Sequence, residues 1–324
     1  MRNIAVFIGN RADAGPLGPV VKAIEAHPGL RVSTLDLDGN DPALWFSVFR
    51  PDCVVLLGDR HELLIAAHAA LLAQIPIAHI HGGETTRGSF DDKVRRAVSQ
   101  LADIHFVAAQ DFALNLYDMG IDSNAIHVVG PPGLDDLETD EVSEFGSGFF
   151  LVCLHPDTTA DVPYNMEMAG ALCEALDRFP DRKVVAIDCN RDPGGEAIWQ
   201  AIITHGGRKS GQAPFILQSS MNRRLYLTAL KHAAVCIGNS SSFVIEAPAL
   251  GAPTVLVGDR QRGRPLAGTI RCAIETADAI EAAVRDSLSK WIDADTGRPA
   301  PLALPYGRGG ASQKIAEILA IWHS

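Results

Sequence analysis

Long apolar runs are missing from the sequence. No run approaches the roughly 20 residues that a membrane-spanning helix needs, and the start, Met1–Phe7, lacks a charged region followed by an apolar stretch and a cleavage site. Positive charge is also scarce, with 28 Lys and Arg against 39 Asp and Glu and a formal net charge of -11. This balance argues against a general nucleic-acid binder, because phosphate backbones call for clustered Lys and Arg. We therefore expect a soluble cytoplasmic protein with no membrane and no nucleic-acid partner.

Paired cysteines and a dinucleotide fingerprint are missing as well. The six cysteines lie far apart with no CxxC pair, and several sit in apolar, strand-like runs. We expect buried, reduced thiols rather than metal ligands. The first apolar run is followed by Gly9-Asn-Arg-Ala, which does not form the GxGxxG of dinucleotide binding. The sequence thus predicts neither a metal nor a cofactor such as NAD.

What the sequence does contain is an alternation of short β-branched runs with longer amphipathic segments, the pattern of parallel strands joined by helices. Near-continuous apolar runs such as VVLL indicate strands that are covered on both faces. Strands are expected at 3–9, 31–37, 53–57, 75–80, 104–108 and 125–129, and again at 149–154, 183–188, 215–218, 235–238 and 254–257.

The length of 324 residues and the 47% hydrophobic content favour two domains with large cores. Composition changes between Gly130 and Gly148, a stretch rich in Gly, Pro, Ser and acids, so we place the boundary there. The predicted domains are 1–145 and 146–324, and the last helix, Gly310–Trp322, is a candidate to pack back on the N-terminal domain. We expect an α/β protein with two Rossmann-like domains facing a cleft. In such sheets ligands bind outside the carboxyl ends of the strands.

Two short motifs follow predicted strands in the N-terminal half. In GNRADAG (9–15), Arg11 is placed to reach an anionic ligand, although a solvated turn explains the motif equally well. In LLGDRHEL (56–63), Asp59 follows a buried strand and a glycine, so its carboxylate is expected at the rim of the sheet. Asp59 is either a catalytic or orienting group or the N-cap of the next helix.

A longer stretch, HIHGGETTRGSFDDKVRRA (79–97), follows another predicted strand. Gly82 and Gly83 permit a turn that other residues resist. The next helix is expected to begin near Asp91 or Asp92, one capping it while the other faces the cleft.

The same stretch carries three titratable side chains, His79, His81 and Glu84. Their H-x-H-x-x-E spacing in a loop is not a strong metal-ligand pattern. Carboxylates crowded in a partly buried cleft raise one another's pKa, which suits acid/base chemistry.

The most informative motif is CIGNSSSFVIEAPALGAPTVLVGDRQRGRP (236–265). Asn239, Ser240 and Ser241 follow a strand and turn the chain into a predicted helix, which makes an anion site from hydroxyls, backbone donors and the helix dipole. Glu246, about one turn into that helix, is placed to accept hydrogen bonds from ribose hydroxyls. The alternative is a serine-capped helix with a surface glutamate. Three arginines in the next loop are placed to clamp a diphosphate: Arg260, Arg262 and Arg264.

Taken in order, these motifs resemble those of a known family. GNRADAG, LLGDR, HIHGGETTRGSFDDKVRRAVSQLADIHFV, LHPDT, NRRLYLTALKHA and IGNSSSFVIEAPALGAPTVLVGDRQRGR are similar to motifs of the hydrolysing UDP-N-acetylglucosamine 2-epimerases of sialic acid and legionaminic acid biosynthesis. The resemblance covers almost the whole chain. It implies the GT-B fold, with the nucleotide held by the C-terminal domain, the sugar in the interdomain cleft, and a homo-oligomer, dimer or tetramer.

The resemblance also implies a reaction. A base removes the proton at C2 of the sugar while UDP leaves from C1; water then adds to the 2-acetamidoglucal, and the product is a free manno sugar. The predicted catalytic residues are Asp59, Glu84, Asp91 and His155. The predicted substrate-binding residues are Arg11, His81, Asn239, Ser240, Ser241, Glu246 and Arg264.

Three departures from the family pattern leave alternatives open. Relatives often read HIEGGE where this chain has HIHGGE, so either His81 or Glu84 takes the role of that glutamate. The segment DLDGNDPALWFSVFRP (36–51) is shorter than usual, so part of a cleft wall or of a subunit-contact surface, up to a whole strand and helix, is expected to be missing. Arg96 replaces the His of an RHA motif. The alternative functions are a GT-B glycosyltransferase and a catalytically impaired UDP-sugar-binding protein.

Overall fold

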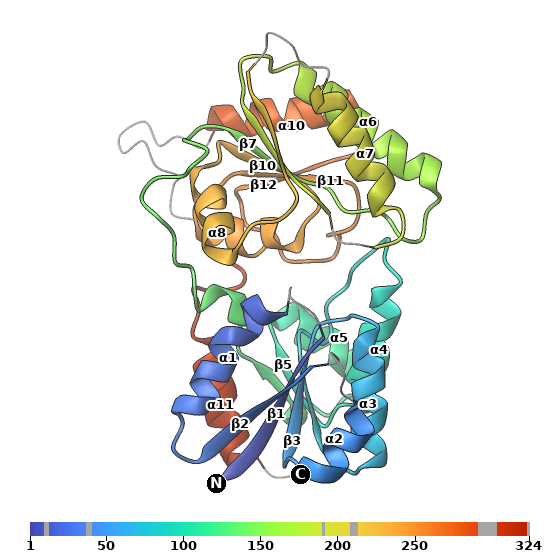
Figure 1. Ribbon diagram of the computed structural model, residues 1–324, viewed down its shortest axis with the longest axis vertical. Coiled ribbons are helices and arrows are strands. Elements are labelled where there is room, and N and C mark those ends of the chain that lie inside the picture. Colours follow the sequence, from blue (N-terminus) through green and yellow to red (C-terminus); the bar gives the residue numbers. More distant parts are fainter. Residues whose placement is uncertain (10–12, 37–40, 190–191, 208–212, 291–302, 323–324) are drawn as a thin grey trace. The chain divides into compact units, whose positions relative to one another are not determined.

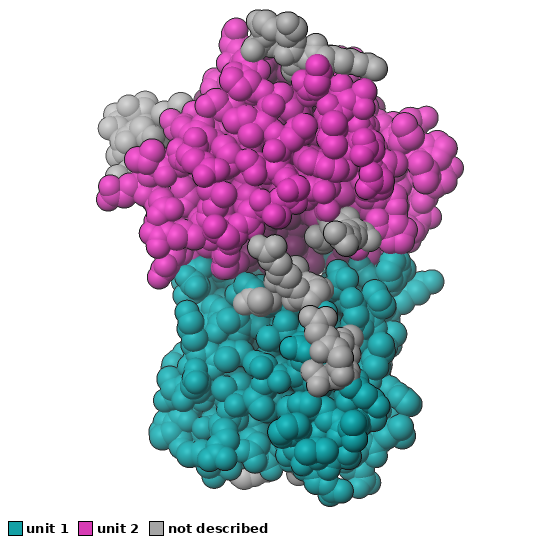
Figure 2. Space-filling view, viewed as in Figure 1, with its two compact units in different colours: residues 1–85, 90–136, 306–324 teal, residues 86–89, 137–305 magenta. Residues whose placement is uncertain are grey.

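The computed structural model describes residues 1–9, 13–36, 41–189, 192–207, 213–290 and 303–322 (Figure 1). Contacts divide the chain into two compact units, which Figure 2 colours separately. Unit 1 comprises Met1–Thr85, Phe90–Asp136 and Tyr306–Ser324; unit 2 comprises Thr86–Ser89 and Leu137–Pro305. Each unit is built on its own sheet.

Unit 1 contains a six-stranded parallel sheet in the order β2-β1-β3-β4-β5-β6. The strands are β1 (Arg2–Ile8), β2 (Leu30–Asp36), β3 (Cys53–Leu57), β4 (Ile77–Ile80), β5 (Ile104–Val107) and β6 (Ile126–Val128). From β1 the chain goes first to one neighbour and then to the other, so the strand order reverses between β1 and β3. At such a switch point the loops at the carboxyl ends diverge and leave room for a ligand.

Helices cover both faces of this sheet, as the apolar runs predict. They are α1 (Ala14–Ala26), α2 (Pro42–Phe49), α3 (Glu62–Leu72), α4 (Asp91–Leu101), α5 (Gln110–Asp118) and α11 (Ala311–Ile321). On one face, Ile4 and Val6 of β1 pack with residues of α1 and α11, including Ile24 and Ile315. On the other face, β1 and β3 pack with α2, α3 and α4, which lie side by side in Figure 1.

Unit 2 contains a second six-stranded parallel sheet in the order β12-β11-β10-β7-β8-β9. Its strands are β7 (Phe150–Cys153), β8 (Val184–Ile187), β9 (Phe215–Gln218), β10 (Val235–Gly238), β11 (Thr254–Val257) and β12 (Ile270–Ala273). Its helices are α6 (Val162–Asp177), α7 (Gly195–Gly207), α8 (Arg223–His232), α9 (Glu246–Ala249) and α10 (Ala277–Lys290). The order reverses between β7 and β10, which makes this the second switch point.

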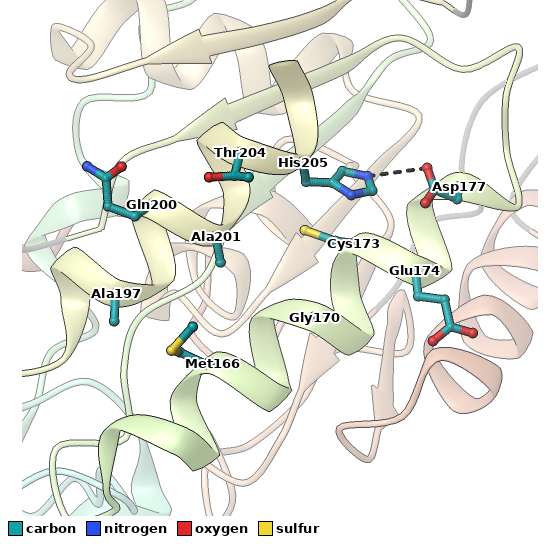
Figure 3. Close-up of a pocket in the computed structure, with 10 residues that line it drawn as sticks. All are labelled: Met166, Gly170, Cys173, Glu174, Asp177, Ala197, Gln200, Ala201, Thr204 and His205. Carbon is teal, nitrogen blue, oxygen red and sulfur yellow. Dashed lines mark ion pairs between the residues drawn. The ribbon is translucent and has the colours of Figure 1, made fainter. Parts of the chain in front are cut away.

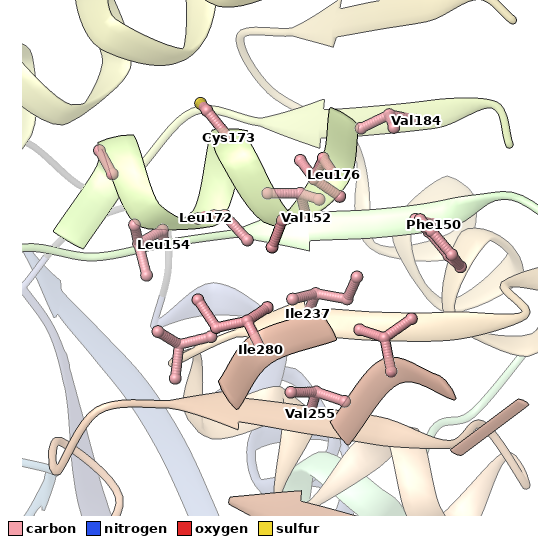
Figure 4. Packing of buried hydrophobic residues seen from close by; sticks show 14 of the residues in the cluster. Phe150, Val152, Leu154, Leu172, Cys173, Leu176, Val184, Ile237, Val255 and Ile280 are labelled. Atoms are coloured by element: carbon pink, nitrogen blue, oxygen red, sulfur yellow. The ribbon is translucent and has the colours of Figure 1, made fainter. Parts of the chain in front are cut away.

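The core of unit 2 fills the space between this sheet and its helices (Figure 4). Val152 and Ile237, on the adjacent strands β7 and β10, pack with Leu172 and Leu176 of α6 and Ile280 of α10. These side chains are almost fully buried. The core therefore holds the carboxyl ends of β7 and β10 in fixed register.

The strands expected from the sequence are all present, with bounds that differ by at most two residues. The sequence reading missed β12, and the shortened segment 36–51 contains the helix α2. A prediction of one helix after the serines is wrong: a 3-10 turn, Ser241–Phe243, is followed by the short α9.

Cysteines are free thiols, but Cys272 is exposed rather than buried. In the described part of the chain, every helix is too short or too polar to cross a membrane.

Candidate functional site

A buried arginine organises the carboxyl ends of β3 and β4. Arg95 of α4 is only 3% exposed, and its guanidinium donates to the Asp59 carboxylate and to the carbonyl of His81, the latter at 3.1 Å. The same guanidinium lies 3.3 Å from the Glu84 carboxylate. Burial alone would lower the pKa of Arg95, but Asp59 and Glu84 raise it above its ordinary value. Arg95 therefore stays charged and holds two acids at the carboxyl ends of β3 and β4.

His81 and Glu84 form a pair beside this arginine. The chain takes a left-handed conformation at His81, with φ of 64°, which turns the loop back so that the imidazole Nδ1 meets a Glu84 oxygen. Glu84 is 4% exposed, and its other oxygen faces Arg95. A carboxylate bound to one ring nitrogen fixes the tautomer and orientation of an imidazole. The pair therefore presents the second nitrogen of His81 in a defined direction.

Glycine is required in the same loop. Gly83 has φ of +74°, and a Cβ there would overlap the carbonyl oxygen of Phe112. Asn115 of α5 donates to the Gly83 carbonyl at 2.8 Å. The turn that precedes Glu84 is thus fixed by its own geometry and by α5.

His79 has a structural role. Its ring is fully buried and bonds Ser99 Oγ at 3.1 Å and the Gly58 carbonyl at 2.8 Å. Burial lowers the pKa of His79 to about 3, so the ring is neutral at pH 7. Because Gly58 precedes Asp59, His79 ties β4 to the turn that carries the Asp59 carboxylate.

The two aspartates of the FDD motif lie in the first turn of α4, which begins at Asp91. The prediction that one of them caps the helix is wrong: the N-cap is Phe90, without a side-chain cap bond. Asp92 instead pairs with Arg96, one turn further on, at 3.2 Å. Asp91 is partly buried. Carboxylates in a first turn are favoured by the helix dipole. Asp59 is likewise not the N-cap of α3, which is His61.

At the second switch point, the side chain of Asn239 binds the backbone of His155. The His155 amide donates to Asn239 Oδ1 at 2.7 Å, and Asn239 Nδ2 donates to the His155 carbonyl at 2.9 Å. Gly238, with φ of +145°, brings the chain so close that a Cβ would overlap the carbonyl oxygen of Cys153. The LHPDT loop and the serine loop are thereby held together.

The His155 imidazole is neutral at pH 7. Burial, with a smaller contribution from Arg260, lowers its pKa to about 3. Its Nε2 lies 3.5 Å from the Cys153 sulfur, whose own pKa burial raises to about 12. A neutral ring both donates and accepts a hydrogen bond, so His155 can contact a phosphate or glycosidic oxygen without carrying charge.

The serine loop differs from the predicted anion site. Ser240 is 9% exposed and shares a 3.0 Å hydrogen bond with Ser242, which also bonds Tyr226. Glu246 is the first residue of α9 rather than a residue one turn into a long helix. Its carboxylate oxygen Oε1 lies 3.9 Å from the guanidinium nitrogen Nη1 of Arg223. The four residues of α9 carry little dipole. Hydroxyls and backbone amides are therefore the donors that this loop offers.

Two of the three arginines of the next loop have different partners, and the third is buried. Arg260 donates to the Pro156 carbonyl at 2.7 Å, so it supports the LHPDT loop. Arg262 is exposed and pairs with Asp259 at 3.1 Å, whereas Arg264 is 8% exposed. That the three arginines clamp a diphosphate stays a prediction. Arg11 lies outside the described residues.

A cavity of about 480 Å³ lies elsewhere in unit 2, between α6 and α7 (Figure 3). Cys173 and Gly170 line it, and at one end His205 pairs with Asp177 at 3.3 Å. None of the predicted site residues lines this cavity. Within the described ranges, no group of three or more His, Cys, Asp or Glu side chains is placed to hold a metal ion.

Arg95 is the site residue that the sequence reading missed. Asp59, His81 and Glu84 were predicted separately, and the structure gathers them around this one guanidinium. A signal was present: Arg95 falls beside Val94 and Val98 on the apolar face of α4, where a charge needs a partner.

Two parallel six-stranded sheets, each with polar side chains at its switch point, define an α/β enzyme fold of the GT-B-like kind. A family model described as UDP-N-acetylglucosamine 2-epimerase matches residues 43–320, and the chain belongs to that family. A solved structure of similar fold is the UDP-GlcNAc 2-epimerase of Methanocaldococcus jannaschii in complex with UDP-GlcNAc and UDP. Its TM-score is 0.78 at 17% identity, over 98% of this chain and 99% of that chain.

Two curated relatives carry more specific names. The chain is 30% identical over 230 residues to the GDP/UDP-N,N'-diacetylbacillosamine 2-epimerase (hydrolyzing) of Campylobacter jejuni. The alignment covers 68% of this chain and 59% of that protein. It is 32% identical over 251 residues to the UDP-N,N'-diacetylbacillosamine 2-epimerase (hydrolyzing) of Legionella pneumophila. That alignment covers 74% of this chain and 65% of the Legionella protein. The aligned regions thus span less than two thirds of either relative's length.

Proposed function

We propose that the protein is a hydrolysing 2-epimerase of nonulosonic acid biosynthesis. Its substrate is UDP-N-acetylglucosamine or a UDP-2,4-diacetamido-6-deoxy analogue, and its products are UDP and the free manno sugar. The observation that carries the proposal is the cluster of Asp59, His81, Glu84 and Arg95 at the carboxyl ends of β3 and β4, in which Glu84 and Arg95 are buried. The names of the Campylobacter and Legionella relatives support the hydrolytic outcome and the diacetamido substrate.

The chemistry explains why such a cluster is useful. A base removes the proton at C2, the C1–O bond breaks, and UDP leaves with the electron pair, which gives a 2-acetamidoglucal. Water then adds its hydroxyl at C1, and an acid protonates C2 from the opposite face. Acid/base groups are therefore needed on both faces of the ring. We assign them to Asp59, Asp91 and the His81–Glu84 pair.

The nucleotide is assigned to unit 2. We propose that Asn239, Ser240, Ser241 and Arg264 contact the diphosphate and that Glu246 accepts hydrogen bonds from the ribose. His155 would then act near the glycosidic oxygen or phosphate as a neutral ring. Support comes from the second switch point, where His155 and Asn239 are bound together and Ser240 is almost buried.

Proton NMR in D2O tests the reaction directly. The purified protein is incubated with UDP-N-acetylglucosamine and, separately, with the 2,4-diacetamido-6-deoxy counterpart. We expect free UDP together with a manno sugar deuterated at C2, and the faster reaction identifies the preferred substrate. Saturable UDP binding without release of UDP would overturn the proposal in favour of an inactive binder, and release only when an acceptor is added would indicate a glycosyltransferase.

Variants separate the two proposed sets of residues. Asp59→Asn and Asp91→Asn should lower kcat at least 100-fold with UDP affinity near wild type. Ser240→Ala with Glu246→Ala should mainly weaken UDP binding. Asp92→Asn is the matched control, because Asp92 is occupied by Arg96 on the helix surface. Equal loss in Asp91→Asn and Asp92→Asn would contradict the assignment.

A further inference from the structure

A network of hydrogen bonds leads from α8 to the imidazole of His155. The hydroxyl of Tyr226 is bonded to Ser242 Oγ, which lies 3.0 Å from Ser240 Oγ. At the other end, the Cys153 sulfur lies 3.5 Å from His155 Nε2. Burial raises the pKa of Cys153 to about 12, and a hydrogen bond that Ser240 donates to the sulfur acts against this rise. The five side chains therefore form one connected network, in which Cys153 and Ser240 are buried.

The protons in this network follow one direction. Each hydroxyl or thiol has one proton to donate. Burial raises the pKa of Tyr226 well above its ordinary value, so the phenol keeps its proton. In the described part of the chain Ser242 is the one hydrogen-bond partner of this phenol, so Tyr226 donates to Ser242. Ser242 then donates to Ser240, and Ser240 donates to the Cys153 sulfur. The thiol proton of Cys153 is left for His155 Nε2.

The last bond of the network fixes the tautomer of His155. A neutral imidazole carries one N–H proton, and the nitrogen that accepts a hydrogen bond is the one without it. Because Nε2 accepts from Cys153, the proton resides on Nδ1. We infer that Cys153 is a positioning residue that holds His155 in its Nδ1–H form. The three hydroxyls behind Cys153 set the direction in which its thiol donates.

The tautomer matters for the reaction, and this step of the inference rests on the proposed function. Negative charge builds up on the diphosphate when the C1–O bond breaks and UDP leaves. With its proton on Nδ1, His155 donates a hydrogen bond to a phosphate oxygen, whereas the other tautomer would present a lone pair and repel that oxygen. Loss of one such donor lowers kcat by about 100- to 1,000-fold in other enzymes.

Histidine NMR measures the tautomer without any substrate. In protein labelled with 15N-histidine, two-bond proton–nitrogen correlations distinguish Nδ1–H from Nε2–H rings, and His155→Gln identifies the signal of His155. We expect Nδ1–H in the wild type and in Cys153→Ser, whose hydroxyl can donate in place of the thiol, but Nε2–H in Cys153→Ala. Cys236→Ala is the matched control, because Cys236 is a buried thiol on the neighbouring strand β10 and lies outside the network. An Nε2–H ring in the wild type, or an Nδ1–H ring that persists in Cys153→Ala, overturns the inference.

Kinetics shows whether the tautomer serves the reaction. Cys153→Ala should lower kcat by roughly 10-fold or more and leave KM and the Kd of UDP near wild type, and Cys153→Ser should recover kcat to within about threefold of wild type. Circular dichroism confirms that each variant is folded. An unchanged kcat in Cys153→Ala, or an equal fall in Cys236→Ala, overturns the inference. A wild type that releases no UDP refutes the proposed function instead, and the tautomer measured by NMR then decides the inference alone.

Tyr226→Phe tests the far end of the network, because it removes the first donor. Ser242 then no longer receives a proton and can donate in either direction, so we expect a mixture of both His155 tautomers. Tyr164→Phe is the control: the Tyr164 hydroxyl donates to Glu275 at 2.7 Å and lies outside the network. A His155 ring that stays wholly Nδ1–H in Tyr226→Phe, or that changes equally in Tyr164→Phe, overturns the directed network.

Discussion

Replacing Arg95 tests the electrostatic core of unit 1. Arg95→Met keeps much of the aliphatic length but leaves the carboxylates of Asp59 and Glu84 near each other without their shared cation. Removing one partner of a buried ion pair costs about 3–5 kcal/mol, because the remaining charge stays desolvated. Arg95 is only 3% exposed, so solvent screens this loss little. We expect the free energy of unfolding of unit 1 to fall by about 4 kcal/mol at pH 7.5.

The adjacent arginine provides the control. Arg96 also pairs with an aspartate one turn away, but its side chain is 62% exposed, and such surface pairs contribute about 0.3–0.5 kcal/mol. Urea unfolding followed by circular dichroism gives the difference between Arg95→Met and Arg96→Met, and hydrogen exchange of β3 and β4 locates it in unit 1. A difference below about 1 kcal/mol would refute the view that Arg95 holds these acids together.

Two further predictions concern stability. Burial lowers the pKa of His105 in β5 to about 4, below the ordinary 6.5. Because the unfolded state binds a proton first, stability is lost as pH falls from about 6.5 toward 4. In urea titrations His105→Leu should remove about 2 kcal/mol of the stability loss between pH 7 and pH 5, and an unchanged pH dependence of the unfolding free energy would contradict the assignment. Gly238→Ala should destabilise unit 2 by more than 2 kcal/mol, because the new Cβ would overlap the backbone of Cys153. Gly170→Ala on α6, where a Cβ meets no neighbouring atom, should stabilise unit 2 by about 0.5–1 kcal/mol. Similar melting temperatures for the two variants would count against the close approach at Gly238.

Much of the fold was predictable because parallel strands buried on both faces leave a clear signal. VVLL and VCIG read as strands without any tertiary knowledge, and the structure confirms them as β3 and β10. The strand β12 was missed because its sequence, IRCA, mixes buried and exposed positions and is polar in part. Edge strands of this kind carry no continuous apolar run.

The site was predictable residue by residue but not as an arrangement. Asp59 and Glu84 were found because they follow strands, and strand ends meet at one edge of a parallel sheet. That Arg95 lies between them depends on the packing of α4, which no local pattern specifies. The expectation that crowded carboxylates raise one another's pKa omitted this cation. Likewise, the short α9 was misread because Pro248 and the preceding turn interrupt the pattern of a longer helix.

The placement of α11 has a consequence for biosynthesis. Unit 1 contains the first strand of the chain and also its last helix, whose Ile315 and Leu319 complete the same apolar cluster as Ile4 and Val6. The ribosome therefore makes every residue from 9 to 310 before that cluster can close, and unit 2, which ends at Pro305, is fully synthesised first. The sheet that begins the chain must wait with one face covered by α1 alone, and a nascent chain stalled before α11 would offer the rest of that face to chaperones.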